Sequence, residues 1–96
     1  MLAVDLAVQP GREAELRSAY LEQFRPTITQ QPGFRGVELF EATGTERWLL
    51  LIDFESEEAR LKWVDTPQHA QVWPKIERCC GDIGVRLVKT VDKARG

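Results

Sequence analysis

The side chain best suited to proton transfer in this sequence is His69, the only histidine among 96 residues. Imidazole is the one side chain whose ordinary pKa lies close to neutrality, so His69 could act as a general base in a cleft. The alternative is a structural histidine near a helix N-terminus, partly buried and hydrogen-bonded. The sequence leaves both roles open.

Aromatic side chains surround this candidate base at helical spacing. Trp73 follows His69 by about one helical turn, which places the two side chains on one face, and Trp63 lies on the preceding helical segment. We expect Tyr20 and Phe24 of the first helix to form the opposite wall. These aromatic residues predict a substrate-binding slot for a flat molecule between helices and sheet, with His69 as the catalytic residue. They could equally be ordinary core residues.

The sequence lacks the residue patterns of nucleophilic catalysis, nucleotide binding and metal binding. No serine lies at a nucleophile spacing, and no glycine-rich loop has a nucleotide-binding pattern. One histidine and the adjacent Cys79 and Cys80 do not supply a metal site. A disulfide between these neighbours would need a distorted backbone, so we expect inert thiols, one buried and one near the surface, with a redox role as the alternative. We therefore predict neither a cofactor nor a bound metal.

Composition and charge narrow the class of protein further. The net charge is −2, with 13 basic and 15 acidic residues mixed along the chain, so nucleic acid is not an expected partner. No apolar run reaches the roughly 18 residues of a membrane span, and no membrane partner is expected. The start of the chain lacks the features of a secretory signal, which predicts a cytoplasmic location. The length predicts a single domain over residues 1–96, ordered over about 2–91, with a frayed tail at 92–96.

The chain alternates between strand and helix patterns. Leu2 to Val8 alternate with period two, and a long helix should follow from Arg12 to about Gln31. Pro26 should kink this helix, or break it at Arg25. Its apolar stripe is Leu16, Ala19, Tyr20, Phe24 and Ile28.

The second half of the chain predicts a hairpin, two helices and a last strand. Strands at 34–42 and 46–55 flank a loop at Thr43-Gly44-Thr45. Ser56 should cap a helix through Asp65, and Thr66-Pro67 should open another to about Cys80. Gly81 should stop that helix before a strand at 83–91. The inner face of this last helix should carry His69, Val72, Trp73, Ile76 and Cys80.

This order predicts an α+β fold, a ferredoxin-like β-α-β-β-α-β antiparallel sheet with helices on one face. The strand from Trp48 to Phe54 is apolar on both faces, although an antiparallel strand needs only one buried face. Leu49 and Leu51 point to the open face, where Asp5 should pair with Arg35 or Arg86. We expect a homodimer through this open face, which would close two sheets into a dimeric α+β barrel.

Three segments carry a resemblance to a known family, and it extends over about residues 2 to 91. They are Gln31-Pro-Gly-Phe-Arg-Gly-Val-Glu-Leu, Phe54-Glu-Ser-Glu-Glu-Ala and Trp63-Val-Asp-Thr-Pro-Gln-His. With this layout, the chain resembles the antibiotic biosynthesis monooxygenase family of dimeric α+β barrels. The resemblance implies an oxidoreductase, since that family includes cofactor-independent monooxygenases that act on polyketide quinols and also haem-degrading enzymes.

The residues depart from both branches of that family. Trp63 matches the haem-degrading branch, but Trp73 stands in place of its ligating histidine and Val4 in place of its asparagine, so haem degradation is not expected. Leu50 and Phe54 stand where the quinol-oxidising branch carries asparagine and tryptophan. The leading hypothesis is a cofactor-independent monooxygenase that oxidises a small aromatic or quinol-type substrate with dioxygen. The alternatives are a non-catalytic small-molecule-binding or accessory dimer of the same fold, and an isomerase or lyase that needs only one base.

Overall fold

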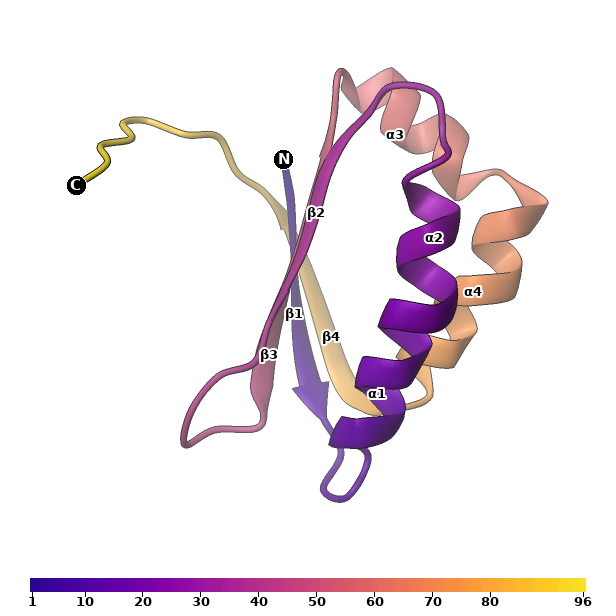
Figure 1. Cartoon of the computed structure of the whole chain (residues 1–96), viewed down its shortest axis with the longest axis vertical. Coiled ribbons are helices and arrows are strands. Elements are labelled where there is room, and N and C mark those ends of the chain that lie inside the picture. Colours follow the sequence, from indigo (N-terminus) through magenta and orange to yellow (C-terminus); the bar gives the residue numbers. More distant parts are fainter.

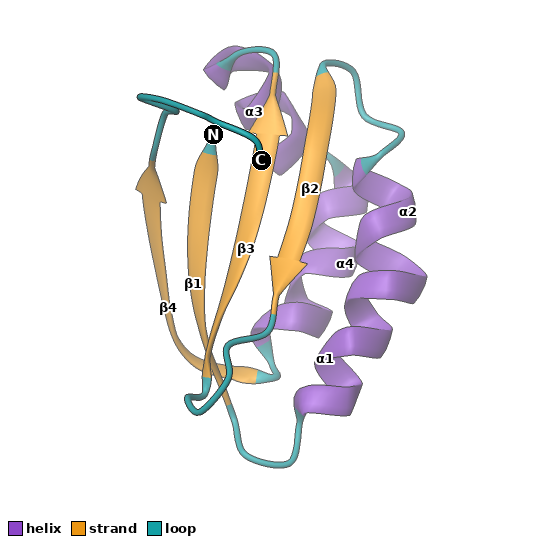
Figure 2. Cartoon of the chain, turned by 60° about the vertical axis from the view of Figure 1, so that its left-hand side comes forward, coloured by secondary structure: helices purple, strands orange, loops and turns teal.

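Four antiparallel strands form one sheet with all the helices on one side of it. The computed structural model describes residues 1–96, and the strand order is β2-β3-β1-β4. Figure 1 shows the helical layer against one face, and Figure 2 shows the strands side by side in front of it. The strands are β1 (Leu2–Val8), β2 (Phe34–Phe40), β3 (Arg47–Phe54) and β4 (Cys80–Leu87). The helices are α1 (Glu13–Ala19), the π-helical η1 (Tyr20–Phe24), α2 (Arg25–Ile28), α3 (Glu57–Val64) and α4 (Pro67–Glu77).

The core lies between the helices and the inner face of the sheet, as the apolar patterns predict. On β1, Val4, Leu6 and Val8 are each at most 3% exposed, and every residue of the predicted stripe on the first helix is buried. Because opposite residues of antiparallel strands share a face, β3 adds its own alternate residues to this core. Those residues are Trp48, Leu50, Ile52 and Phe54.

Pro26 does not break the first helix, which runs from Glu13 to Ile28 without interruption. The irregularity lies before the proline, where η1 widens the helix and the Arg25 N–H donates to the Tyr20 carbonyl. A proline inside an α-helix lacks an N–H and crowds the carbonyl four residues back, and one wider turn relieves both problems. The predicted end at Gln31 is three residues too late.

The junction between α4 and β4 also differs from the prediction. The helix ends at Glu77 instead of about Cys80, and Gly81 lies inside the strand instead of stopping the helix. Cys80 pairs with Val8 of β1, and the Gln9 N–H donates to the Cys79 carbonyl at 2.9 Å. Sheet pairing therefore competes successfully for residues that helical periodicity assigns to α4. The strand also ends earlier than predicted, at Leu87.

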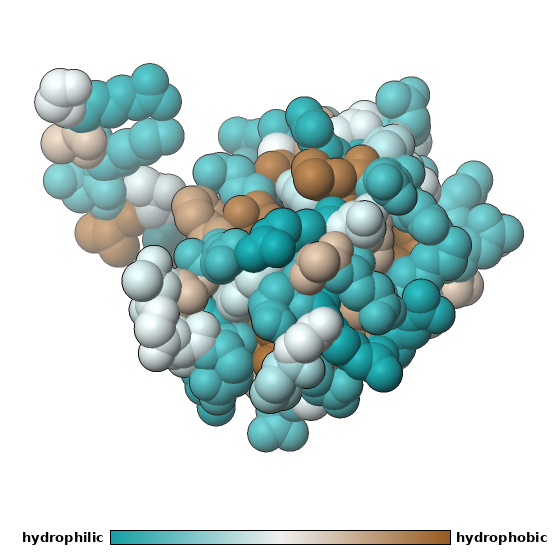
Figure 3. All heavy atoms as spheres, turned by 60° about the horizontal axis from the view of Figure 1, so that its bottom comes forward, coloured by the Kyte–Doolittle hydropathy of each residue, from teal (hydrophilic) through white to brown (hydrophobic).

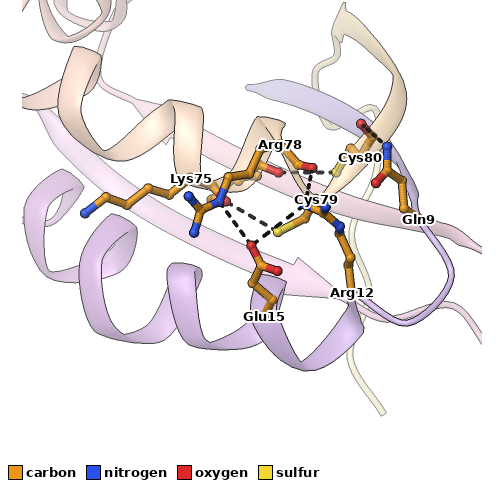
Figure 4. Close-up of polar contacts among 8 residues, drawn as sticks. Gln9, Arg12, Glu15, Lys75, Arg78, Cys79 and Cys80 are labelled. Atoms are coloured by element: carbon orange, nitrogen blue, oxygen red, sulfur yellow. Dashed lines mark hydrogen bonds and ion pairs between the residues drawn. The ribbon is translucent and has the colours of Figure 1, made fainter.

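Both cysteines lie at this junction, and both are buried, which corrects the expectation of one thiol near the surface. Figure 4 shows the two thiols close to the end of α4. The Cys79 Sγ donates to the Lys75 carbonyl at 3.4 Å, and the Cys80 Sγ donates to the Ile76 carbonyl at 3.5 Å. Burial raises the pKa of Cys80 to about 11, so the thiol form dominates at neutral pH.

The remaining signals at the ends of elements are confirmed. The Ser56 side chain accepts from the Ala59 N–H, and the Thr66 side chain accepts from the His69 N–H. Glycines 11, 33 and 44 all adopt positive φ, as their turns require. The hairpin strands are slightly shorter than predicted, and they end at Phe40 and begin again at Arg47.

The face of the sheet without helices carries apolar and paired charged residues. Leu49 and Leu51 of β3 are half-buried there, and Phe40 is 43% exposed. Asp5 pairs with Arg86 at 3.4 Å, which is one of the two predicted pairings, while Arg35 lies 3.7 Å from Asp53 instead.

Candidate functional site

An apolar pocket of about 180 Å³ opens between the helical layer and the inner face of the sheet. Strands β1, β3 and β4 form its floor, and η1, α3 and α4 form its walls. Two polar side chains, His69 and Arg60, reach this otherwise apolar pocket. The lining residues are Leu2, Val4, Phe24, Ile52, Arg60, Trp63, Val64, His69, Trp73 and Val85.

Four of the five residues predicted for the site lie around this pocket and contact one another. The His69 ring packs edge-on against Trp63, with 5.0 Å between ring centroids, and lies nearly parallel to Trp73 at 6.2 Å. Phe24 packs against both indoles, at 6.0 Å from Trp63 and 6.2 Å from Trp73. The imidazole is therefore held in an aromatic cluster that three helical segments assemble.

Tyr20, the fifth predicted residue, does not line the pocket. It is buried in the core, and its ring stacks on Phe24 at 6.1 Å. Burial raises the pKa of Tyr20, and this effect exceeds the opposing effect of Arg25. The tyrosine thus supports the wall of the pocket from behind.

Thr66 fixes the position of His69 relative to Trp63. Its hydroxyl donates to the Trp63 carbonyl at 2.8 Å and accepts from the His69 N–H at 3.1 Å. One side chain therefore ends α3 and begins α4, and Pro67 favours the helical φ at the first position of α4. This short connection brings the indole and the imidazole together, although they lie on different helices.

The environment of His69 favours a neutral imidazole. Burial lowers the pKa of His69 below its ordinary value, because an apolar pocket disfavours the charged ring. The backbone N–H of His69 is bonded, but the ring has no hydrogen-bond partner in the protein. His69 is half-buried near the start of α4, as in the structural alternative, but its ring nitrogens are not bonded within the protein and remain available to a ligand.

Sequence reasoning missed Arg60, which lines the pocket from α3. Its side chain is only 17% exposed and pairs with Glu57 one turn earlier. The sequence does contain a signal that could have placed Arg60 at the pocket. Arg60 precedes Trp63 by three residues, so the two side chains lie on the same side of α3.

This pocket is small for a ligand of the size of a porphyrin. Its volume of about 180 Å³ lies below the roughly 300–1,000 Å³ of typical ligand pockets, and the Trp73 indole occupies part of the wall. No group of three or more histidine, cysteine or acidic side chains is placed to hold a metal ion.

The fold and this pocket place the chain among the small α+β proteins with a ferredoxin-like antiparallel sheet. The chain belongs to the antibiotic biosynthesis monooxygenase family, whose sequence model matches residues 1–73. The comparison with curated proteins finds no significant match. None of the helices is both long enough and apolar enough to cross a membrane.

Solved structures of distant relatives share the fold over almost their whole length. SnoaB, a cofactor-independent oxygenase from Streptomyces nogalater, has a TM-score of 0.78 at 14% identity, with 94% of this chain and 92% of that chain covered. Rv0793 from Mycobacterium tuberculosis has a TM-score of 0.77 at 17% identity, with 98% and 96% covered. An MhuD variant with two manganese protoporphyrin IX molecules per active site has a TM-score of 0.76 at 21% identity, with 99% and 98% covered. At these identities the likeness establishes the fold alone.

Proposed function

We propose that the protein is a cofactor-independent monooxygenase that oxidises a small phenol or quinol with dioxygen. The observation that carries this proposal is a half-buried imidazole, free of hydrogen bonds, in the wall of an apolar aromatic pocket. Membership of the family supports oxygenase chemistry, and SnoaB is a cofactor-independent oxygenase of the same fold. The catalytic residue in this proposal is His69, and the substrate lies against Phe24, Trp63 and Trp73.

In the proposed reaction the substrate supplies all the electrons. His69 accepts the phenol proton, and the phenolate passes an electron to dioxygen. The two radicals then combine at a ring carbon to form a C–O bond, and the resulting peroxide anion takes the proton back from the imidazolium, which gives a hydroperoxide. Loss of water from this hydroperoxide, with the proton of that ring carbon, leaves a carbonyl, so a phenol and one O₂ become a quinone and one H₂O. The first step requires a neutral imidazole, which is the form that the apolar walls favour.

The size of the pocket supports a substrate with one aromatic ring. A cavity of roughly 150 Å³ lined by apolar side chains accommodates benzene, and this pocket is slightly larger, at about 180 Å³. A fused three-ring molecule would have to extend well beyond it. We therefore choose one-ring phenols, including hydroquinone, as the first substrates to test.

We also propose that the protein works as a homodimer through the open sheet face. Leu49, Leu51 and Phe40 form the apolar part of that face, and no helix of the same chain covers it. A second copy would remove this apolar surface from water, as is common for exposed apolar sheet faces. The pocket lies on the other side of the sheet, so a dimer of this kind leaves it open.

Oxygen uptake tests the catalytic proposal. Wild-type protein should consume one O₂ per product with a reactive one-ring phenol, and ¹⁸O₂ should place one labelled atom in the quinone. His69→Gln should lower the rate on the order of 10²-fold or more, because it removes the base. Gln71→Ala, an exposed change on the same helix, should leave the rate unchanged. Unchanged turnover in His69→Gln would exclude His69 as the base.

A non-catalytic binding protein is the second candidate, and the lack of a partner that orients the imidazole favours it. In catalytic triads the base is held by a third group, whereas here the His69 ring has no hydrogen bond. Tight binding of one-ring phenols, without oxygen uptake across a broad panel, would favour this candidate over the monooxygenase.

A further inference from the structure

Arg60 occupies a boundary between two adjoining hollows of the surface. It lines the apolar pocket together with His69, and it also lines a more polar hollow of about 370 Å³ near the start of β1. Leu2 and Ile52 are the other residues that both hollows share. A ligand in the apolar pocket therefore has one cationic side chain within reach at its border.

The guanidinium of Arg60 uses two of its three nitrogens in its ion pair with Glu57. Its Nε donates to the Glu57 carboxylate at 3.0 Å, and its Nη2 contacts the same carboxylate. The third nitrogen, Nη1, has no hydrogen-bond partner in the protein, although the side chain is only 17% exposed. The two N–H groups of Nη1 are thus left for another acceptor, and they reach solvent in the free protein, since no unpartnered polar side-chain atom is buried.

We propose that Arg60 is a specificity-determining residue that selects aromatic ligands carrying an acidic group, such as a carboxylate on a phenol ring. This inference rests on the proposed function, because it assumes that the aromatic pocket is the ligand site. The ring lies against the indoles, and the carboxylate accepts from Arg60 at the border of the pocket. Charge-assisted bonds between arginine and carboxylate are among the strongest that a protein makes.

The charges nearby favour an approach from the apolar side. The polar hollow also contains Asp53, Glu55 and Glu57, which repel an anion there, and Arg35 is already paired with Asp53. The apolar pocket contains no acidic residue. An anion that enters through the apolar pocket therefore meets Arg60 with Glu57 as the one carboxylate already bound to it.

Two matched ligands test the proposal, 3-hydroxybenzoate and its neutral amide, 3-hydroxybenzamide. Binding is followed by quenching of the fluorescence of Trp63 and Trp73 at pH 8, where the imidazole is neutral. Wild-type protein should bind the acid at least about tenfold more tightly than the amide, since a charge-assisted bond is lost in the amide. Arg60→Gln should abolish this preference and leave the affinity for the amide unchanged. Arg35→Gln, the same change of charge outside the apolar pocket, should keep the preference.

Substitution of Glu57, the partner of Arg60, should raise the affinity for the acid instead of lowering it. Glu57→Gln frees the guanidinium from its carboxylate, so the acid should bind several-fold more tightly while the amide is unaffected. If Arg60→Gln fails to fold, this variant decides, and an unchanged affinity for the acid would overturn the proposal.

The remaining outcomes separate this proposal from the function on which it rests. Equal affinity of wild-type protein for the acid and the amide would overturn the role of Arg60 and leave the aromatic pocket as the ligand site. Absence of quenching by both compounds would overturn the aromatic site itself, and the selectivity of Arg60 with it.

Discussion

His69 lies between two indoles, and its ring makes no hydrogen bond with the protein. Thr66 determines this placement, because its side chain bonds the end of α3 and the start of α4. The same surroundings make the ring a plausible base, since burial favours the neutral form. Position and protonation state therefore have one common cause, the packing of the imidazole against apolar aromatic side chains.

The pH dependence of oxygen uptake should report this environment. The pKa of His69 is lowered below its ordinary value of about 6.5, so the neutral base persists into mildly acidic solution. The rate should rise with pH, with an inflection below pH 6.5. A pH–rate profile with a phenol substrate measures this, and His69→Gln should lose the inflection. An inflection clearly above 6.5 would contradict a desolvated imidazole.

At the scale of elements, the turn before β2 is the most constrained connection in the fold. Gly33 has a φ of +79°, and a Cβ at this position would lie 2.8 Å from the Cβ of Ala59 and 3.0 Å from the Cγ of Glu55. The Gly33 carbonyl also accepts from the Glu55 N–H at 2.8 Å. This contact brings the first helix, the sheet and the start of α3 together, and α3 carries Trp63 and Arg60.

Gly33→Ala should therefore destabilise the protein more than a matched change at Gly11. Both glycines have positive φ, but a Cβ at Gly11 would meet nothing within 4 Å. We expect Gly11→Ala to lower the free energy of unfolding by roughly 1–2 kcal/mol from the backbone alone. Gly33→Ala should cost a further 1–3 kcal/mol or so from crowding. Urea denaturation of both variants measures the difference, and equal losses would show that the contact with Ala59 relaxes freely.

At the scale of the whole molecule, the two faces of the sheet have different roles. The inner face forms the core and the floor of the pocket, while the open face carries Leu49, Leu51 and Phe40 without a covering helix. The surface seen in Figure 3 is mainly hydrophilic, with small apolar patches scattered over it. The exposed apolar side chains on the helical layer, such as Leu21 and Leu61, are separate from the open sheet face.

The dimer proposal predicts a difference between two matched charge substitutions. Leu51→Asp should dissociate or unfold the protein, because a buried unpaired charge costs roughly 3–5 kcal/mol. Leu61→Asp should leave the assembly intact, since Leu61 is 51% exposed on α3. Light scattering at micromolar concentration measures the mass of each variant. A stable folded monomer of the wild-type protein under these conditions would contradict the proposal.

The sequence by itself determined the order of elements, the antiparallel α+β fold and most of the core. Residues such as Leu6, Leu16 and Leu50 follow the periods of strand and helix, and these periods depend only on local backbone geometry. The caps at Ser56 and Thr66 and the hairpin loop at Gly44 depend on equally local geometry, so they could be predicted correctly.

Only the tertiary structure decided where packing or pairing with other elements changes the end or the shape of a helix. It also decided which side chains share the pocket. Pairing with β1 drew Cys80 into the sheet, and packing kept the helix continuous at Pro26 through a wider turn. Tyr20 and Phe24 belong to the same stripe, yet only Phe24 reaches the pocket, and Arg60 reaches it unpredicted. Periodicity assigns a face to each residue, whereas a pocket depends on distances between elements that are far apart in the sequence.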